Sequence, residues 1–313
     1  DNYILLLALT QVIGNITMWF YIPGKVKLPK LSTLNFGHHL LPTLGLFLPT
    51  IATQIYLQLN KTMLPLFASG SISLSAFYEN ADKIVKVSLA LVTAMGTVML
   101  PRVANHYANG NTKAVNDAIY KSMDFVTAMA APLMFGMMAL GPKMSIWYMG
   151  PNFLPAGWTI TILSPIVLFI AWSNVIGTQY LMPVNRTRDF TISVTVGAVV
   201  NVLLNFIFIP LWSLYGAAVA TIIAEFAVTL YQVYVIRHQL ELGVLFHGLW
   251  KYLVAGVVMF AVIATMAWRM PPFPTSTVVQ IAVGVVVYVI MVILMRANFV
   301  LTVQGFIKGR LHK

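Results

Sequence analysis

Charged and hydroxyl side chains share one helical face in an apolar stretch of this chain, residues 77–103 (FYENADKIVKVSLALVTAMGTVMLPRV). Five polar residues in it recur at steps of three, four or seven: Glu79, Lys83, Lys86, Thr93 and Thr97. Such steps place side chains on one face of an α-helix. Lysines and threonines on one face can attract an anion and form a hydrogen-bonding wall.

Three further apolar segments also have one polar face each. Polar and ionisable groups at membrane depth are costly, face the protein interior and commonly mark substrate or ion pathways. Four such helices therefore predict a shared aqueous cavity within a helical bundle. The three faces are Asp189, Ser193, Gly197, Asn201 and Asn205; Thr221, Glu225, Thr229 and Gln232; and Thr50, Gln54, Gln58 and Lys61.

Helix packing is the alternative interpretation of these faces. Small and hydroxyl-bearing residues on one face also allow close contact and hydrogen bonds between membrane helices, and this explains Ser193, Gly197, Thr221 and Thr229 at least as well. Glu225 differs, because a carboxylate at mid-span needs a partner, a proton or water. Ion coupling or gating and a structural hydrogen bond both remain open for it.

The lysines of the opening stretch also have two interpretations. Lys61, Lys83 and Lys86 lie near a predicted membrane boundary, where a lysine can extend its ammonium group to the interface. Glu79 and Asp82 can form i,i+4 ion pairs with Lys83 and Lys86. A cavity role and a simple surface role are both consistent with this pattern.

Signatures of enzymes and metal sites are missing from the sequence. It contains no GxxxxGK[ST], HExxH or GxSxG motif and no DxD-like acidic pair. Cysteine is absent, and the adjacent His38 and His39 would point to different helix faces. We therefore predict neither catalysis nor a metal or other cofactor.

The composition indicates a polytopic α-helical membrane protein. Hydrophobic residues make up 59% of the 313 residues, charged residues 9%, and the mean hydropathy is +0.84, whereas soluble domains have roughly 25% charged residues. A membrane-spanning helix needs about 20 mainly apolar residues. We predict about nine spans, at residues 3–21, 38–58, 84–101, 123–141, 157–180, 190–209, 216–236, 250–268 and 276–295.

The basic residues predict the orientation of the bundle. If the first helix runs inward, most of the 19 Lys and Arg residues fall on one side, which the positive-inside rule makes cytoplasmic. The C-terminus is then cytoplasmic, and the charge serves orientation and contact with anionic lipids rather than nucleic acid. Asp1 leads straight into an apolar helix without an export signal, so we expect an odd number of further spans upstream.

Three segments together resemble the bacterial polysaccharide flippases. They are NKTMLPLFASGSISLSAFYENADKIVKVSLALVTAMGTVMLPRVANHYANGN, LSPIVLFIAWSNVIGTQYLMPVNRTRDFTISVTVGAVVNVLLNFIFIP and YGAAVATIIAEFAVTLYQVYVIR, and the similarity covers nearly the whole chain. The chain is thus similar to Wzx-type proteins, in the polysaccharide transporter branch of the multidrug/oligosaccharidyl-lipid/polysaccharide exporter superfamily. Where many relatives have Asp-Lys, this chain has Asn60-Lys61, so no ion pair is expected from residue 60.

The resemblance implies a MATE-like fold of two lobes around a central cavity, of which this chain holds the later part. Its helices would correspond to helices 6–14 of the family. Residues 1–34 would be the last helix of the first lobe with a cytoplasmic linker. Residues 35–242 would form the second lobe, and residues 243–313 two extra helices and a basic tail.

The function implied is the transfer of undecaprenyl-pyrophosphate-linked oligosaccharides across the bacterial cytoplasmic membrane, for capsule or exopolysaccharide synthesis, by alternating access. Lys83 and Lys86, assisted by Lys61, would attract the pyrophosphate. Glu225 or Asp124 would serve if transport is coupled to H⁺ or Na⁺. The cavity-lining residues would be Glu79, Thr93, Thr97, Gln54, Asn201 and Asn205.

Several alternatives remain at this point. A lipid II flippase and a cation-coupled multidrug exporter belong to the same superfamily, although a drug exporter should have acidic and aromatic cavity walls. A membrane glycosyltransferase or polymerase should have a long outer loop with catalytic carboxylates, and the predicted outer loops are short. An inactive truncated fragment is a further alternative. Lipid-linked oligosaccharide and anionic lipids are the expected partners, with a polysaccharide polymerase and co-polymerase as further candidates.

Overall fold

The computed structural model describes residues 2–20, 58–67 and 72–300, and these contain helices and connecting loops without any strand. The chain divides into two compact units, residues 1–44 and 45–313. In the first unit, helix α1 (Asn2–Trp19) agrees with the predicted span 3–21. The predicted span 38–58 lies outside the described residues except for its last position.

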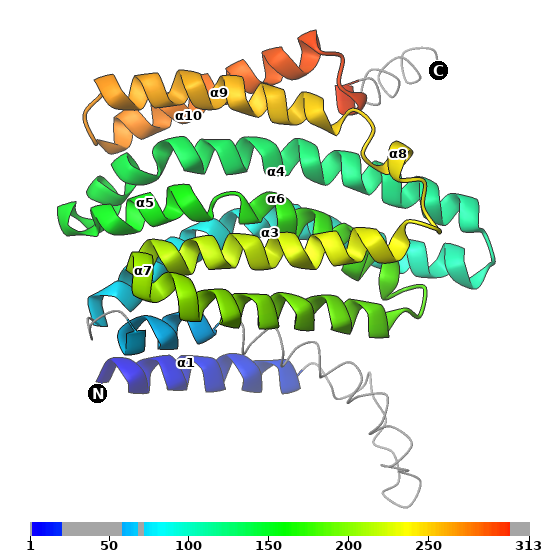
Figure 1. Ribbon diagram of the computed structural model, residues 1–313, viewed down its shortest axis with the longest axis horizontal. Coiled ribbons are helices and arrows are strands. Elements are labelled where there is room, and N and C mark those ends of the chain that lie inside the picture. Colours follow the sequence, from blue (N-terminus) through cyan, green and yellow to red (C-terminus); the bar gives the residue numbers. More distant parts are fainter. Residues whose placement is uncertain (1, 21–57, 68–71, 301–313) are drawn as a thin grey trace, which may run out of the picture. The chain divides into compact units, whose positions relative to one another are not determined.

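The second unit is a bundle of long helices (Figure 1). A helical segment at residues 58–67 precedes α3. The later elements are α3 (Ile72–Ala108), α4 (Thr112–Met149), η2 (Pro151–Phe153), α5 (Leu154–Leu163), α6 (Ile166–Ser173), η3 (Asn174–Leu181), α7 (Thr187–Ile236), α8 (Leu242–Leu245), α9 (Leu249–Arg269) and α10 (Pro274–Leu294).

The membrane class predicted from composition agrees with these helices. Four helical stretches in the described residues are long and apolar enough to cross a bilayer, and two bent helix pairs raise the number to six. This differs from the predicted nine, partly because the 50-residue helix α7 is counted once although it folds back on itself. The count of nine is therefore not confirmed.

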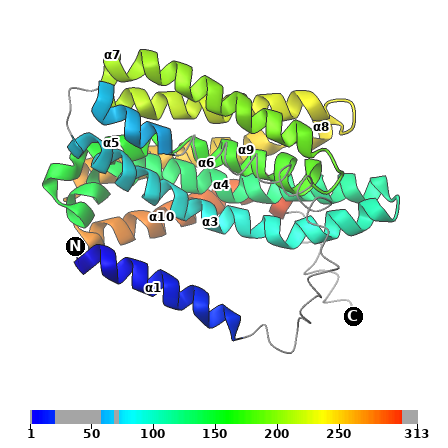
Figure 2. The same cartoon turned by 90° about the horizontal axis from the view of Figure 1, so that it is seen from below.

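Helix α7 is a tight antiparallel hairpin with its turn at Ser213. The backbone there has φ 50° and ψ −125°, shortly after Pro210. Gly216 lies against the first arm, where an added Cβ would be 2.0 Å from the Phe208 carbonyl oxygen. The two arms lie side by side in both views (Figures 1 and 2). The predicted spans 190–209 and 216–236 correspond to these two arms.

The predicted span 157–180 is bent and contains an irregular turn. The axis changes direction by 45° between residues 151–163 and 166–181, at Pro165, which has no N–H to continue the hydrogen-bond ladder. The following segment, η3, is wound as a π-helix. Its Met182 N–H donates to the carbonyl of Gly177 at 3.1 Å, an i→i+5 bond of the kind that often occurs at functional sites.

The last two helices, α9 and α10, pack on α4 and on each other (Figure 1). Gly256 allows α9 to approach α4 so closely that an added Cβ would lie 2.2 Å from the Phe135 ring. The Tyr288 hydroxyl of α10 donates to the Ala128 carbonyl of α4 at 2.9 Å. Small residues and interhelical hydrogen bonds of this kind replace the hydrophobic driving force that is missing within lipid.

Candidate functional site

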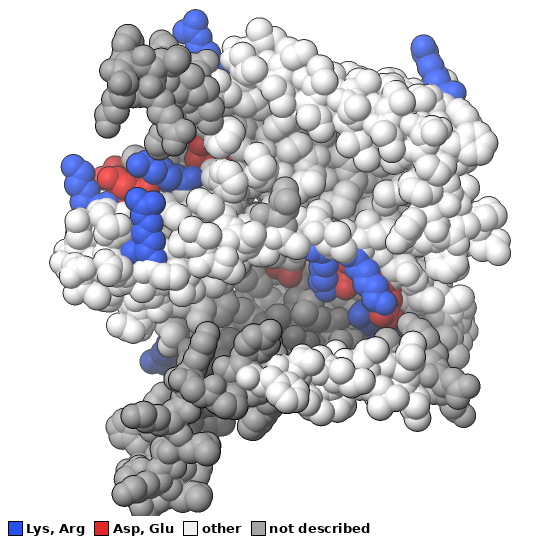
Figure 3. Space-filling view, turned by 180° about the vertical axis from the view of Figure 1, so that it is seen from behind, with Lys and Arg blue, Asp and Glu red and all other residues white. Residues whose placement is uncertain are grey.

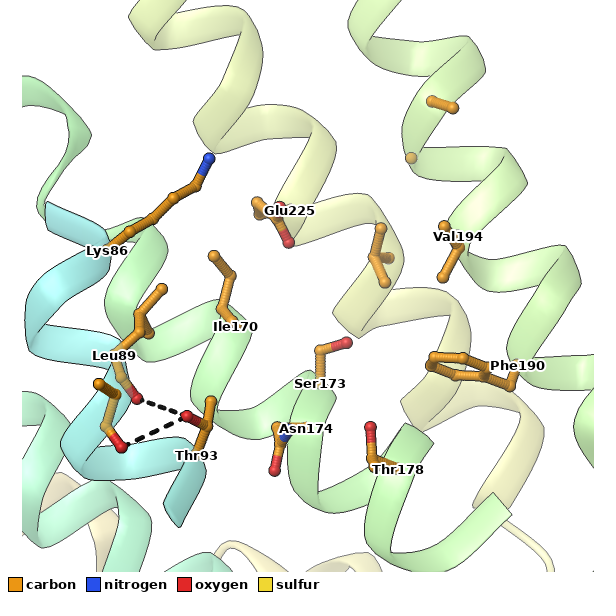
Figure 4. Close-up of a pocket in the computed structure, with 14 residues that line it drawn as sticks. Lys86, Leu89, Thr93, Ile170, Ser173, Asn174, Thr178, Phe190, Val194 and Glu225 are labelled. Carbon is orange, nitrogen blue, oxygen red and sulfur yellow. Dashed lines mark hydrogen bonds between the residues drawn. The ribbon is translucent and has the colours of Figure 1, made fainter. Parts of the chain in front are cut away.

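A cavity of about 410 Å³ lies among α3, α6, η3 and both arms of α7 (Figure 4). Its walls are apolar over most of their area, with polar groups at a few places. The charged and polar lining residues are Lys86, Thr93, Ser173, Asn174, Thr178 and Glu225. Because these residues come from four separate helical stretches, the bundle brings together groups that lie far apart in the sequence.

Lys86 supplies the positive charge of the cavity wall. Its ammonium nitrogen lies 2.6 Å from a carboxylate oxygen of Asp82, one turn earlier on α3. The side chain of Asp82 is only 8% exposed, whereas that of Lys86 is 33% exposed. A second carboxylate, Glu225, lies with these two residues around a smaller cavity that adjoins the first. Lys86 is therefore an accessible cation flanked by two carboxylates.

The other two predicted phosphate-binding lysines belong to a separate ionic cluster. Glu79 accepts from Lys83 at 2.9 Å and lies 3.9 Å from the ammonium group of Lys61. The Lys83 side chain is 66% exposed. On the face shown in Figure 3, basic and acidic side chains likewise occur in groups on a surface that is mostly uncharged. The structure thus places Lys86 at the cavity and Lys83, Lys61 and Glu79 outside its lining.

The two asparagines predicted to line a sugar path lie in a buried hydrogen-bond network. Asn205 donates to Asn60 at 2.5 Å and to Asn201 at 2.9 Å. Asn60 donates in turn to Tyr78 at 2.7 Å and to Thr221 at 2.9 Å. Asn201 and Asn205 are fully buried and are not among the residues of the cavity wall. This network joins the segment 58–67, α3 and both arms of α7. These asparagines therefore form hydrogen bonds between packed helices, as the helix-packing interpretation of the polar faces predicts.

The remaining stripe residues are divided between the cavity and the helix contacts. Thr93 lines the cavity, whereas Thr97 is exposed and donates to the Ala94 carbonyl at 2.8 Å. Ser193 accepts a 3.0 Å hydrogen bond from Gln232 of the opposite arm. Gln54 lies outside the described residues. Spacing alone therefore identified polar faces without identifying what each face contacts.

Asp124 lies in a different part of the bundle from Glu225. It accepts a hydrogen bond from the Tyr252 hydroxyl at 2.9 Å. It lines a second cavity, of about 550 Å³, together with Lys121 and His247. The two carboxylates predicted for ion coupling therefore border separate cavities. Within the described residues, no group of three or more His, Asp and Glu residues could hold a metal ion.

Three polar residues of the cavity wall were missed by the sequence analysis: Ser173, Asn174 and Thr178. They are half-buried and lie together on one wall (Figure 4). The step of five from Ser173 to Thr178 does not fit α-helical periodicity, but it suits a segment with i→i+5 hydrogen bonds. The only signal in the sequence was a cluster of polar residues, WSNVIGTQ, inside an apolar span.

Apolar spans packed around a cavity whose wall contains an accessible cation define a polytopic membrane protein of the transporter type. The chain belongs to the lipid II flippase MurJ family, whose profile matches residues 2–289. The family is one of flippases, in agreement with the absence of enzyme motifs. MurJ is thus better supported than the Wzx-type assignment, which is not confirmed.

Two curated relatives are similar over part of their length. The lipid II flippase MurJ of Bacillus subtilis (strain 168) is 26% identical over 153 residues, which cover 48% of this chain and 28% of that protein. A Shigella dysenteriae protein described as an O-antigen transporter is 20% identical over 191 residues, or 61% of this chain and 47% of that protein. This chain therefore spans less than half of either relative.

Two solved structures share the fold. A lipid II flippase MurJ in an inward closed conformation matches with a TM-score of 0.73 at 21% identity, over 91% of this chain and 60% of the other. An outward-facing multidrug resistance MATE transporter of the MOP superfamily matches with a TM-score of 0.54 at 12% identity, over 80% and 63% of the two chains. The MATE-like fold class predicted from the sequence is confirmed.

Proposed function

We propose that this chain forms the part of a lipid II flippase that contains the cation for the pyrophosphate of the substrate. The family match over residues 2–289 carries this proposal. The MurJ-like fold and the MurJ relative in Bacillus subtilis support the same substrate. Lipid II export was the alternative substrate in the sequence analysis, and the comparisons favour it over capsule or exopolysaccharide precursors.

Lys86 is the group at the cavity wall that suits a polyprenyl-pyrophosphate head group. A pyrophosphate is recognised by charge-assisted hydrogen bonds from cations, and Lys86 is accessible at the cavity wall. The volume of about 410 Å³ suits a pyrophosphate and an adjoining sugar rather than a complete glycan. In this proposal Lys86 binds the pyrophosphate, while Lys83 and Lys61 attract it electrostatically from the exposed cluster around Glu79.

The rest of the mechanism follows the sequence-based expectations. Residues 35–242 act as one lobe of the transporter, residues 243–313 as an additional helix pair, and the C-terminus is cytoplasmic. Rocking of this lobe against a second one exposes the cavity to each side in turn. If transport is coupled to H⁺ or Na⁺, Glu225 is better placed than Asp124, because Glu225 lies beside Lys86.

Reconstituted transport of lipid II tests the proposal. The protein is expressed from its complete reading frame and placed in vesicles with fluorescent lipid II in the inner leaflet. Transfer is measured as the fraction of label that reaches a membrane-impermeant quencher outside. We expect Lys86→Ala to slow transfer more than about tenfold, since a hydrogen bond to a charged group contributes about 1.5–3 kcal/mol. Lys113→Ala, an exposed lysine on α4, serves as the control and should transfer normally.

The outcome that overturns the proposal is the absence of lipid II transfer by the unaltered protein. Normal transfer by Lys86→Ala at equal protein abundance would instead remove Lys86 from the mechanism. The two results are distinct, because one concerns the substrate and the other the residue that binds it.

A lipid-linked repeat unit of the O-antigen type is the second candidate substrate. The Shigella dysenteriae relative, with matched residues covering 61% of this chain, supports it, together with the resemblance to polysaccharide flippases. The same vesicles loaded with a polyprenyl-pyrophosphate-linked repeat unit compare the two substrates directly. Polymerase and co-polymerase partners belong to this second candidate alone.

A further inference from the structure

The π-helical segment η3 provides the wall of the cavity that lies opposite Lys86. Figure 4 shows Lys86 and Glu225 toward one end of the cavity, and Ser173, Asn174 and Thr178 grouped toward the other. Ser173 is the last residue of α6, and the other two belong to η3. The end of α6 and the irregular helix η3 thus present three polar groups to the same space.

The hydroxyl groups on this wall have no protein partner in the part of the chain that the structure describes. Threonine hydroxyls in the regular helices donate to a carbonyl one turn back, as Thr93 does to Leu89 at 2.9 Å and Thr127 does to Met123 at 2.7 Å. Such back-bonding is the usual arrangement within a helix. Ser173 and Thr178 make no such bond, so their hydroxyl groups are available to a ligand.

Asn174 adds an amide with donors directed to the cavity. Its carbonyl oxygen accepts from the Gln179 amide at 3.1 Å, and in the described residues its own NH₂ group donates to no other group. Asn174 is half-buried and lies in the cavity wall. The wall therefore offers two hydroxyls, which can donate and accept, and one amide donor.

The segment is held rigidly from behind. Gln179 is fully buried and accepts a hydrogen bond from Ser122 of α4 at 2.5 Å. On the α3 side, an added Cβ at Gly96 would lie 2.8 Å from the Asn174 side-chain oxygen, so α3 packs directly against Asn174. Groups fixed in this way lose little conformational entropy when a ligand binds.

We propose that η3 is a sugar-binding element that recognises the sugar next to the pyrophosphate. Within the described residues, the two hydroxyls and the Asn174 NH₂ group donate to no protein group, so they can pair with the hydroxyl and amide groups of a sugar. The Phe190 ring of the cavity wall offers an apolar surface to the sugar ring (Figure 4). Lys86, across the cavity, binds the phosphate. The inference rests on the proposed function, and it adds the residues that distinguish a glycosylated carrier from the bare polyprenyl pyrophosphate.

Equilibrium binding of two probes to the full-length protein in nanodiscs tests this inference. The probes are polyprenyl pyrophosphate and the same carrier with one sugar attached. We expect Ser173→Ala/Thr178→Val to weaken binding of the glycosylated carrier by about 30-fold, since two neutral hydrogen bonds are lost and each contributes roughly 1 kcal/mol. Binding of the bare carrier should be unchanged. Lys86→Ala should weaken binding of both probes.

The matched control is Ser88→Ala/Thr191→Val, which removes the same atoms. These hydroxyls donate to the carbonyls of Val85 and Thr187 in their own helices, and neither residue lines the cavity. Wild-type affinity is expected for both probes, and equal gel-filtration profiles verify that all variants are folded.

Each outcome has a separate meaning. If the unaltered protein binds both carriers and the η3 variant binds them as tightly, or loses both equally, the sugar-binding role is wrong while the proposed function stands. If the unaltered protein binds neither carrier, the proposed function fails and the inference fails with it.

Discussion

The ammonium group of Lys86 lies 2.6 Å from the carboxylate of Asp82. The cation at the cavity wall is therefore already engaged in an ion pair. Asp82 is buried, whereas Lys86 retains access to the cavity. In the proposed function, an anionic substrate therefore competes with Asp82 for Lys86. We expect this competition to weaken binding of the substrate and to favour its release.

Removing the competing carboxylate should strengthen binding. We expect Asp82→Asn to bind polyprenyl pyrophosphate about fivefold more tightly, because partly exposed i,i+4 pairs contribute up to about 1 kcal/mol. Equilibrium binding in nanodiscs measures this change. Asp189→Asn, which breaks the 2.7 Å pair with Arg186 outside the cavity, is the control and should leave affinity unchanged. Weaker binding by Asp82→Asn would show that Asp82 positions Lys86 instead of competing for it.

The buried asparagine network should contribute to stability. Asn205→Ala removes the donor to Asn60 and Asn201, and we expect a loss of about 1–3 kcal/mol because buried polar partners are left unsatisfied. Thermal unfolding in detergent measures it. Thr195→Ala, an exposed threonine with a bond to its own helix, should change stability by less than about 0.5 kcal/mol. Reduced transport by Asn205→Ala with unchanged stability would instead support the predicted role of Asn205 in lining the path of the sugar.

Close approach of the α7 arms should make Gly197 intolerant of a side chain. An added Cβ would lie 2.3 Å from a methyl group of Val228, and overpacking of this kind costs typically about 1–3 kcal/mol. Gly197→Ala should therefore unfold at a lower temperature. Gly243→Ala, where the added atom meets nothing within 4 Å, should unfold at or slightly above the wild-type temperature. Equal unfolding temperatures for both variants would contradict this packing.

The two ends of α4 should lie on opposite sides of the membrane. The chain has no cysteine, so a single cysteine can report its own side. We expect Asn152→Cys to react with an impermeant thiol reagent in intact cells, and Asn111→Cys to react only after the cells are permeabilised, because the positive-inside bias places residue 111 in the cytoplasm. Both positions are exposed in the structure. The reverse labelling pattern would invert the proposed orientation.

The sequence predicted the membrane class and the positions of most described helices, because long apolar runs are a direct physical requirement of the bilayer. The spacing of its polar residues also selected Lys86 and Thr93, which the structure places at the cavity wall. The same spacing selected Asn201 and Asn205, which the structure places in helix contacts, because periodicity specifies a face and not the neighbour of that face. Ser173 and Thr178 were missed because they lie where the winding changes from α to π, and no local rule predicts that change.

The hairpin form of α7 restricts how the cavity can open. Its two arms are joined by a turn at Ser213 and connected across their length by Ser193 with Gln232 and Gly197 with Val228. Both arms supply cavity wall, including Val194 and Glu225. We therefore expect the two arms of α7 to move together as one unit when the cavity changes shape, rather than to separate from each other.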